Sequence, residues 1–222
     1  PSDEFPVFTE ENIDIRGANS QFSLSYGANY DDKVYLGAGI GITSFYKDVE
    51  RTLTEVPTET DLQQLTLVDA YEQNGVGVNG NFGLIIRPIE FVLIGFNYRT
   101  PTFYTISQVQ EIELSAQYTN GDFLADGIIF EESNYNITTP SRIGAGATFF
   151  IGKNGFITGE IERVQFSGGR LSSVSDPDIQ ENEINADIDQ FNSTNNFRLG
   201  AEFRYEIFRV RGGFAYMEDP VD

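Results

Sequence analysis

Glu160 and Glu162 are residues whose type and spacing could support chemistry, because two neighbouring carboxyl groups can act as an acid and a base. One residue separates them, so on a β-strand both side chains would point to the same face. The chain contains no histidine and no cysteine, which excludes Ser-His-Asp, Cys-His and histidine-ligated zinc sites. We therefore assign the pair to a polar strand face and expect no enzymatic activity, no cofactor and no metal site.

The segment that carries these glutamates belongs to a wider pattern of alternation. Apolar residues occupy every second position, with glycine, serine, asparagine or charged residues between them, which is typical of strands with one apolar side. The pattern predicts four two-stranded units, over residues 21–42, 75–104, 142–166 and 197–216. Glycines such as Gly37, Gly39 and Gly41 line the polar side and indicate either a segment packed closely against it or strong bending of the sheet.

Turn residues predict short reversals within the units, at residues 31–33, 87–90, 153–155 and 206–207. Stretches of roughly twenty to thirty residues join the units. Acidic residues gather in these stretches, within residues 48–72, 111–132 and 176–189. We expect them to be long solvated loops, and the alternative is a surface that binds divalent cations.

A strand that is apolar on one face and polar on the other is typical of the wall of a transmembrane β-barrel. No apolar run approaches the roughly 20 residues of a membrane helix, and the mean hydropathy of −0.27 does not distinguish a soluble chain from a barrel. We predict an all-β fold, an antiparallel transmembrane β-barrel that forms a single domain over residues 1–222, with about eight strands. Short turns would lie on one rim and long acidic loops on the other. The net charge of −20 argues against nucleic acid as a partner.

Charged residues within the strands fall mostly on the predicted polar side, where Arg198, Glu202 and Arg211 alternate with apolar neighbours. Arg99 and Arg163 are the exceptions, because we assign them the parity of the apolar residues. We place both near the outer rim, where a charge that faces lipid costs little.

Four stretches resemble the FadL/OmpP1/TodX outer-membrane transporters, and within that family the version found in Bacteroidetes. They are YGANYDDKVYLGAGIGI (26–42), GFNYRTPTFY (95–104), TTPSRIGAGATFF (138–150) and FRLGAEFRYEIFRVRGGFAYMEDP (197–220). The resemblance implies a fourteen-stranded barrel in the outer membrane of a Gram-negative bacterium, with an N-terminal hatch that blocks the lumen. This chain supplies about eight strands and lacks the hatch's Asn-Pro-Ala stretch, so we expect the hatch and the C-terminal strands to lie outside these residues.

The resemblance also implies passive uptake of long-chain fatty acids or other hydrophobic small molecules, with outer-membrane lipid and the ligand as partners. Tyr98, Arg99 and Pro101 match one element of the family, and residues 211–214 match another. The candidate ligand-binding residues are arginines that would attract a carboxylate and aromatic residues in a loop above them: Arg99, Phe103, Tyr104, Phe123, Phe130, Arg198 and Arg211. The alternative is that the arginines pair with Glu160, Glu162 and Glu202 across a polar lumen.

Two other functions stay open. One is a non-transporting barrel subunit of an outer-membrane secretion or glycan-uptake assembly, whose acidic loops would dock protein partners. The other is a soluble acidic β-sandwich that binds carbohydrate, in which the apolar side chains would lie between two stacked sheets.

Overall fold

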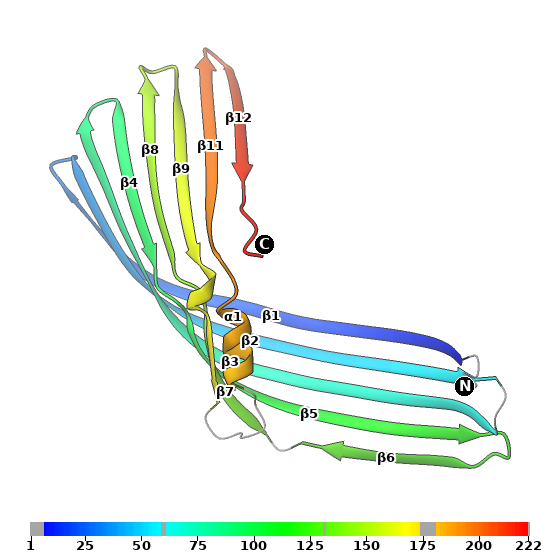
Figure 1. Ribbon diagram of the computed structural model, residues 1–222. Helices are drawn as coiled ribbons and strands as arrows, with labels where there is room; N and C mark the ends of the chain where they lie inside the picture. Colours follow the sequence, from blue (N-terminus) through cyan, green and yellow to red (C-terminus); the bar gives the residue numbers. More distant parts are fainter. Residues whose placement is uncertain (1–6, 59–60, 131, 174–180, 222) are drawn as a thin grey trace. The chain divides into compact units, whose positions relative to one another are not determined.

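The computed structural model describes residues 7–58, 61–130, 132–173 and 181–221, and strands account for most of them (Figure 1). The strands are β1 (Val7–Tyr30), β2 (Val34–Pro57), β3 (Leu62–Ile89), β4 (Val92–Arg99), β5 (Phe103–Tyr118), β6 (Phe123–Ile129), β7 (Ser133–Thr138), β8 (Arg142–Ile151), β9 (Gly155–Gln165), β10 (Arg170–Ser173), β11 (Ser193–Tyr205) and β12 (Phe208–Tyr216). The described helices are η1 (Phe166–Gly168) and α1 (Glu181–Ile188). Neither has the length and apolar character that a membrane-spanning helix requires. The predicted all-β class is confirmed.

All twelve strands belong to one sheet, in the pairing order β10-β7-β5-β3-β4-β8-β9-β11-β12, with β1 beside β2, β2 beside β3 and β6 beside β5. Pro101 separates β4 from β5, and Pro140 separates β7 from β8. Proline lacks the N–H that a ladder needs, so each proline interrupts what is otherwise one strand path. When each interrupted pair counts as one and the short β6 and β10 are set aside, eight paths remain, as the sequence predicts.

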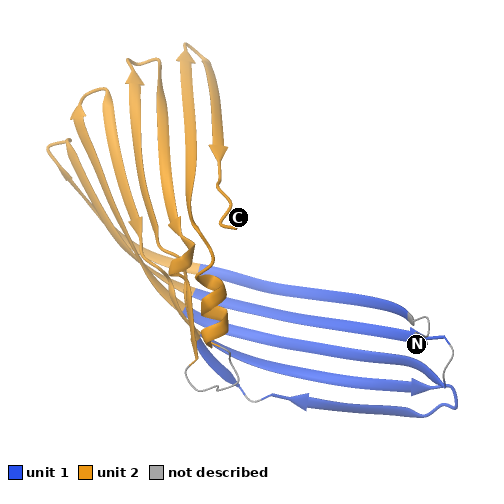
Figure 2. Cartoon of the chain, viewed as in Figure 1, with its two compact units in different colours: residues 1–20, 44–76, 106–135 blue, residues 21–43, 77–105, 136–222 orange. Residues whose placement is uncertain are grey.

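The chain divides into two compact units (Figure 2). Unit 1 comprises Pro1–Ser20, Ser44–Val76 and Ile106–Tyr135, and unit 2 comprises Gln21–Thr43, Gly77–Thr105 and Asn136–Asp222. The long strands β1, β2, β3 and β5 contribute residues to both units. Unit 2 contains the four short turns, and its strands are the ones whose alternation is clearest in the sequence.

The prediction of long acidic loops is wrong for the first two acidic stretches. Residues 48–57 continue β2, residues 62–72 begin β3, and most of residues 111–132 lie in β5 and β6. Apolar and polar residues alternate in residues 48–50 of β2 and 111–117 of β5, where carboxylates and glutamine replace the glycine and serine of the other strands, but not in residues 62–72 of β3. In the third stretch residues 181–188 form α1, while residues 176–180 lie outside the described residues.

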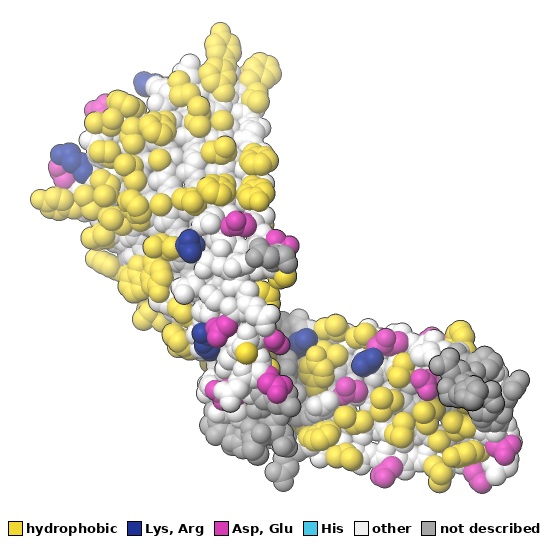
Figure 3. All heavy atoms as spheres, in the orientation of Figure 1, with side chains coloured by type: hydrophobic (Ala, Val, Ile, Leu, Met, Phe, Trp, Pro, Cys, Tyr) yellow, Lys and Arg dark blue, Asp and Glu magenta, His cyan; other side chains and the backbone are white. Residues whose placement is uncertain are grey.

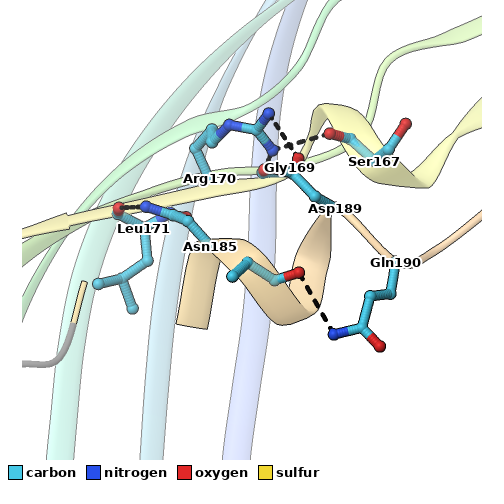
Figure 4. A network of polar contacts seen from close by, with 8 residues as sticks. Ser167, Gly169, Arg170, Leu171, Asn185, Asp189 and Gln190 are labelled. Atoms are coloured by element: carbon cyan, nitrogen blue, oxygen red, sulfur yellow. Dashed lines mark hydrogen bonds and ion pairs between the residues drawn. The ribbon is translucent and has the colours of Figure 1, made fainter. Parts of the chain in front are cut away.

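Side-chain and backbone contacts fix α1 on the segment that precedes it (Figure 4). The Asn185 side chain accepts a hydrogen bond from the Leu171 N–H (2.9 Å) and donates one to the Leu171 carbonyl (2.8 Å), so it pairs with β10 as another strand would. Arg170 forms an ion pair with Asp189 (2.8 Å) and donates to the Ser167 carbonyl (2.8 Å). These contacts join η1, β10 and α1 into one local structure.

The first and last turns lie where the sequence predicts. Asp31 and Asp32 have φ values of 54° and 51°, and the Lys33 N–H donates to the Tyr30 carbonyl (3.1 Å), which together make a two-residue turn of the type that suits strand twist. In the last hairpin Tyr205 pairs with Phe208, and Glu206 takes a φ of 51°.

The other two turns are displaced from their predicted positions. Ile89 pairs with Val92, so the second reversal is at residues 90–91, and Pro88 lies inside β3 beside a register shift, where a proline is tolerated. The third reversal is at residues 152–154, because Gly152 (φ 55°) supplies the left-handed position. Gly155 of the predicted Asn-Gly turn instead begins β9, where an added Cβ would collide with the Glu202 carbonyl.

Candidate functional site

Unit 2 has an apolar face, defined by the residues that cross-strand pairing places on the same side. Leu199 lies opposite Phe214, and Tyr98 lies opposite both Phe82 and Ile143. Members of this face are exposed by 41–68%: Leu36, Ile40, Phe82, Phe96, Ile143, Ile157, Ile161, Leu199, Val210 and Phe214. Hydrophobic side chains are spread over the strands of this unit in Figure 3, with few charged groups among them. Since all twelve described strands belong to one sheet, no second described sheet buries this face, as a sandwich would require.

The opposite side of unit 2, the polar face, carries ion pairs between adjacent strands. Arg198 of β11 lies 3.4 Å from Glu160 and 3.2 Å from Glu162 of β9. Glu202 binds Arg211 of β12 (2.5 Å) and Arg204 (3.5 Å), and its side chain is only 10% exposed. Arg198 and Arg211 therefore pair with the glutamates that the alternative prediction named, and they do so between adjacent strands of the polar face rather than across a lumen.

Arg99 also belongs to the polar face, which corrects its predicted parity. It lies directly opposite Arg142 of β8 and Asn81 of β3, and its Nε donates to the Asn81 Oδ1 (2.9 Å). The apolar residues of β4 take even numbers, so Arg99 falls in the other set. Arg163 does share the apolar face, since it lies opposite Ile143 near the end of β9, away from the short turn.

The four candidate aromatic residues lie in or beside strands, so their predicted place in a loop is wrong. Tyr104 packs over Gly77, where an added Cβ would lie 2.6 Å from a ring atom. Phe103 precedes it and points to the opposite side, with 55% of the side chain exposed. Phe123 begins β6 and Phe130 follows it, both in unit 1, whereas the other five candidates belong to unit 2.

A hollow of about 540 Å³ lies on the polar face, at positions where several neighbouring strands carry glycine. Gly83 and Gly95 form its floor, because a Cβ at either position would meet no atom within 4 Å. Its lining combines apolar groups with a few polar ones: Tyr35, Ile85, Leu93, Asn97, Thr148, Thr158 and Glu160. A mostly apolar cavity with few convergent polar groups is typical of a small-molecule site. These residues lie on the same side of their strands as the glycines, and this shared side was the sequence signal that could have identified them as candidates.

Neighbouring side chains occupy the space above other glycines. Asn79, which is 7% exposed, donates to Gln21 (3.4 Å) and to Thr102 (3.3 Å). The Gln21 and Asn79 side chains meet over Gly41, where an added Cβ would lie 2.6 Å from the first and 2.7 Å from the second. Asn97 covers Gly144 in the same way. At these positions the close packing predicted from glycine is thus provided by adjacent strands.

Within the described ranges, no cluster of three or more acidic side chains is arranged to hold a metal ion. The carboxylates of the acidic segments are distributed over separate strands, Asp48 and Glu50 in β2, Asp69 and Glu72 in β3, and Glu111 and Glu113 in β5.

Comparison with known proteins gives structural matches at low identity. The chain is similar to the toluene transporter TodX of Pseudomonas putida, with 12% identity and a TM-score of 0.44 over 96% of this chain and 73% of that one. It is similar to a TodX deletion mutant described as a monoaromatic hydrocarbon channel (13%, TM-score 0.48, 97% and 74%) and to the CymD monoaromatic hydrocarbon channel (12%, 0.42, 96% and 75%). No family model and no curated protein matches the sequence. Identities and TM-scores this low do not assign the chain to a family.

Proposed function

We propose that this chain forms part of the wall of an outer-membrane β-barrel for the passive uptake of hydrophobic small molecules, with long-chain fatty acids as the leading class. The observation that supports this most directly is the apolar face of unit 2. Soluble monomers rarely expose a continuous apolar surface of this extent, and a bilayer would remove it from water.

The dimensions of the apolar face suit a bilayer. The unit 2 part of β2 runs from Val34 to Thr43, and ten residues extend about 33 Å along a strand. At the tilt of roughly 40° usual in membrane barrels, that length spans about 25 Å, the height of an outer-membrane apolar band. The arginines of the polar face would then line a lumen, where a charge avoids the cost of lipid contact.

The polar face offers a place for a ligand with an apolar body. The hollow over Gly83 and Gly95 would take that body, and Asn97 would provide a hydrogen-bonding group at its side. Among the proposed carboxylate-binding residues, Arg99 is the strongest, because Arg198 and Arg211 already bind glutamates. Tyr104 faces the same side, whereas Phe103 does not, so we propose no ligand contact for Phe103.

A matched pair of glycine substitutions tests this proposal. Gly95→Leu would fill the hollow, while Gly212→Leu adds the same side chain on the apolar face, and neither added Cβ meets an atom within 4 Å. Uptake of labelled oleate would be measured in cells that lack the gene and carry each full-length variant. We expect Gly95→Leu to reduce uptake and Gly212→Leu to retain it. If cells with and without the wild-type gene took up oleate equally, transport would be removed from the account.

A further inference from the structure

The even-numbered side chains of β1, β2 and β3 change character along each strand. In β2 they are Leu36, Ala38, Ile40 and Ile42, followed by Tyr46, Asp48 and Glu50. In β3, which runs the other way, Glu72 precedes Val76, Val78 and Phe82. In β1, Asp14 and Arg16 precede Phe22, Leu24 and Tyr26. On this set of positions each strand carries no charged residue in its unit 2 part, and its first charged residue lies in unit 1, beyond the apolar Val76 in the case of β3.

The apolar residues of unit 2 that are nearest in sequence to unit 1 lie side by side. Asn79 bonds to Gln21, and both side chains meet over Gly41, so residues 21, 41 and 79 form one row across the three strands. Phe22, Ile42 and Val78 are the immediate neighbours of that row, and they are exposed by 71%, 54% and 48%.

The first charged residues also lie side by side, in unit 1. An added Cβ at Gly17 would lie 3.0 Å from the Tyr46 carbonyl, so this part of β1 lies beside residues 46–48 of β2. Arg16 binds Asp14 (3.0 Å), and Asp14, followed by Asp48 and Glu50, raises the pKa of Arg16. Burial, followed by Asp48 and Glu72, raises the pKa of Tyr46, so that ring lies near charges of both β2 and β3. The change from apolar to charged therefore falls at one level on all three strands.

The odd-numbered side of β2 and β3 in unit 1 carries the buried side chains instead. Val49 is 6% exposed, and Lys47 donates to the Tyr71 hydroxyl (3.3 Å). Gln73 donates to Gln108 (2.7 Å) and to Tyr135 (2.9 Å), and Tyr135 is 7% exposed. In unit 1 the even-numbered side of these strands therefore carries Asp48, Glu50 and Glu72, whereas no charged residue of β2 or β3 lies on that side in unit 2.

We infer that contact with hydrocarbon ends on β1, β2 and β3 between the row of Phe22, Ile42 and Val78 and the row of Arg16, Asp48 and Glu72, and that the charged side chains of the second row stand in water. This inference rests on the proposed placement of unit 2 in a membrane. Charged side chains on the lipid side are unfavourable within the apolar band and tolerated near its edge, which would fix the level of the boundary. The inferred boundary does not apply to β6, because that strand exposes apolar side chains at both even-numbered and odd-numbered positions.

These 222 residues contain no cysteine, so single labels give a direct test once any cysteine elsewhere in the full-length protein is replaced by serine. Ile40→Cys and Val78→Cys would carry a fluorophore on the unit 2 side of the boundary, and Glu50→Cys and Glu72→Cys would carry it on the unit 1 side, each in the full-length protein. The labelled proteins would be reconstituted in phosphatidylcholine vesicles with and without bromine on the acyl chains.

We expect brominated lipid to quench the labels at residues 40 and 78 and to leave those at residues 50 and 72 unchanged. Equal quenching at all four positions would overturn the inferred boundary while leaving the membrane placement of unit 2 intact. Loss of quenching at residues 40 and 78 would instead refute that placement, and the boundary with it.

Discussion

Replacing Ala201 with arginine tests whether the apolar face meets lipid. Ala201 is the middle residue between Phe197 and Tyr205 of β11, and Ile157 and Gly212 lie opposite it on either side. The side chain is exposed, and Gly212 leaves space beside it, so the substitution changes solvation with little effect on packing. An arginine on the lipid side near the bilayer midplane costs about 2–4 kcal/mol. That cost lowers the folding equilibrium constant about 30- to 700-fold.

The measurement is urea unfolding of the full-length protein in lipid vesicles, followed by circular dichroism because this sequence has no tryptophan. Ala70→Arg is the matched control, since Ala70 shares the even-numbered side of β3 with Glu72 in unit 1. Its free energy of unfolding should change by less than about 0.5 kcal/mol, as for an ordinary surface site. If Ala201→Arg cost no more than Ala70→Arg, the apolar face would not be lipid-facing.

Three further substitutions test local structure. Tyr135→Phe removes a hydroxyl that accepts from Gln73 and donates to Gln108 (3.1 Å), so it should cost about 1–2 kcal/mol in urea unfolding. Burial raises the pKa of Tyr135 above its ordinary value; its neutral form thus stabilises the fold fully below about pH 10, and this contribution is lost as pH rises through the folded-state pKa. Above about pH 10 the free energy of unfolding should fall less steeply with pH in Tyr135→Phe than in wild type. Equal slopes would contradict the assignment of this pH dependence to Tyr135. Asn185→Ala should speed amide exchange at Leu171, whereas the exposed Gln190→Ala should not. Glu206→Gly should raise the free energy of unfolding by about 1 kcal/mol, because a left-handed residue other than glycine is strained; a destabilised variant would show that the Glu206 side chain matters more.

The sequence predicted most of unit 2, because its alternation is simple. Leucine and isoleucine alternate with glycine in the unit 2 part of β2, and a period of two leaves little ambiguity about which residues share a face. The prediction from sequence failed for unit 1, where β2 continues through Asp48 and Glu50. Acidic residues are depleted in strands, so their density favoured a loop over the correct assignment. What stabilises those strands is pairing with neighbours distant in sequence, which composition does not reveal.

The candidate site was also predicted only in part. Pairing of Arg198 with Glu160 and Glu162 follows from parity once the strands are adjacent, and the sequence offered it as an alternative. The hollow over Gly83 and Gly95 was missed, because it arises from glycines of adjacent strands, Gly83 opposite Asn97 and Gly95 opposite Ile85, and therefore requires the register. The third turn was displaced because Gly152, rather than Asn154, takes the left-handed conformation, and both residues favour turns.

The two proline interruptions lie in adjacent strand paths, and this changes how the sheet is held together there. The Gly80 N–H donates to the Thr100 hydroxyl and the Thr102 N–H to the Thr139 hydroxyl, each at 2.8 Å. Peptide carbonyls would accept these bonds in an uninterrupted ladder. Two rotatable side chains therefore add to the backbone bonds that Thr100 and Thr139 donate to the carbonyls of Gly80 (2.9 Å) and Thr102 (3.0 Å). Valine, although similar in shape to threonine, could not replace either without leaving an amide unsatisfied.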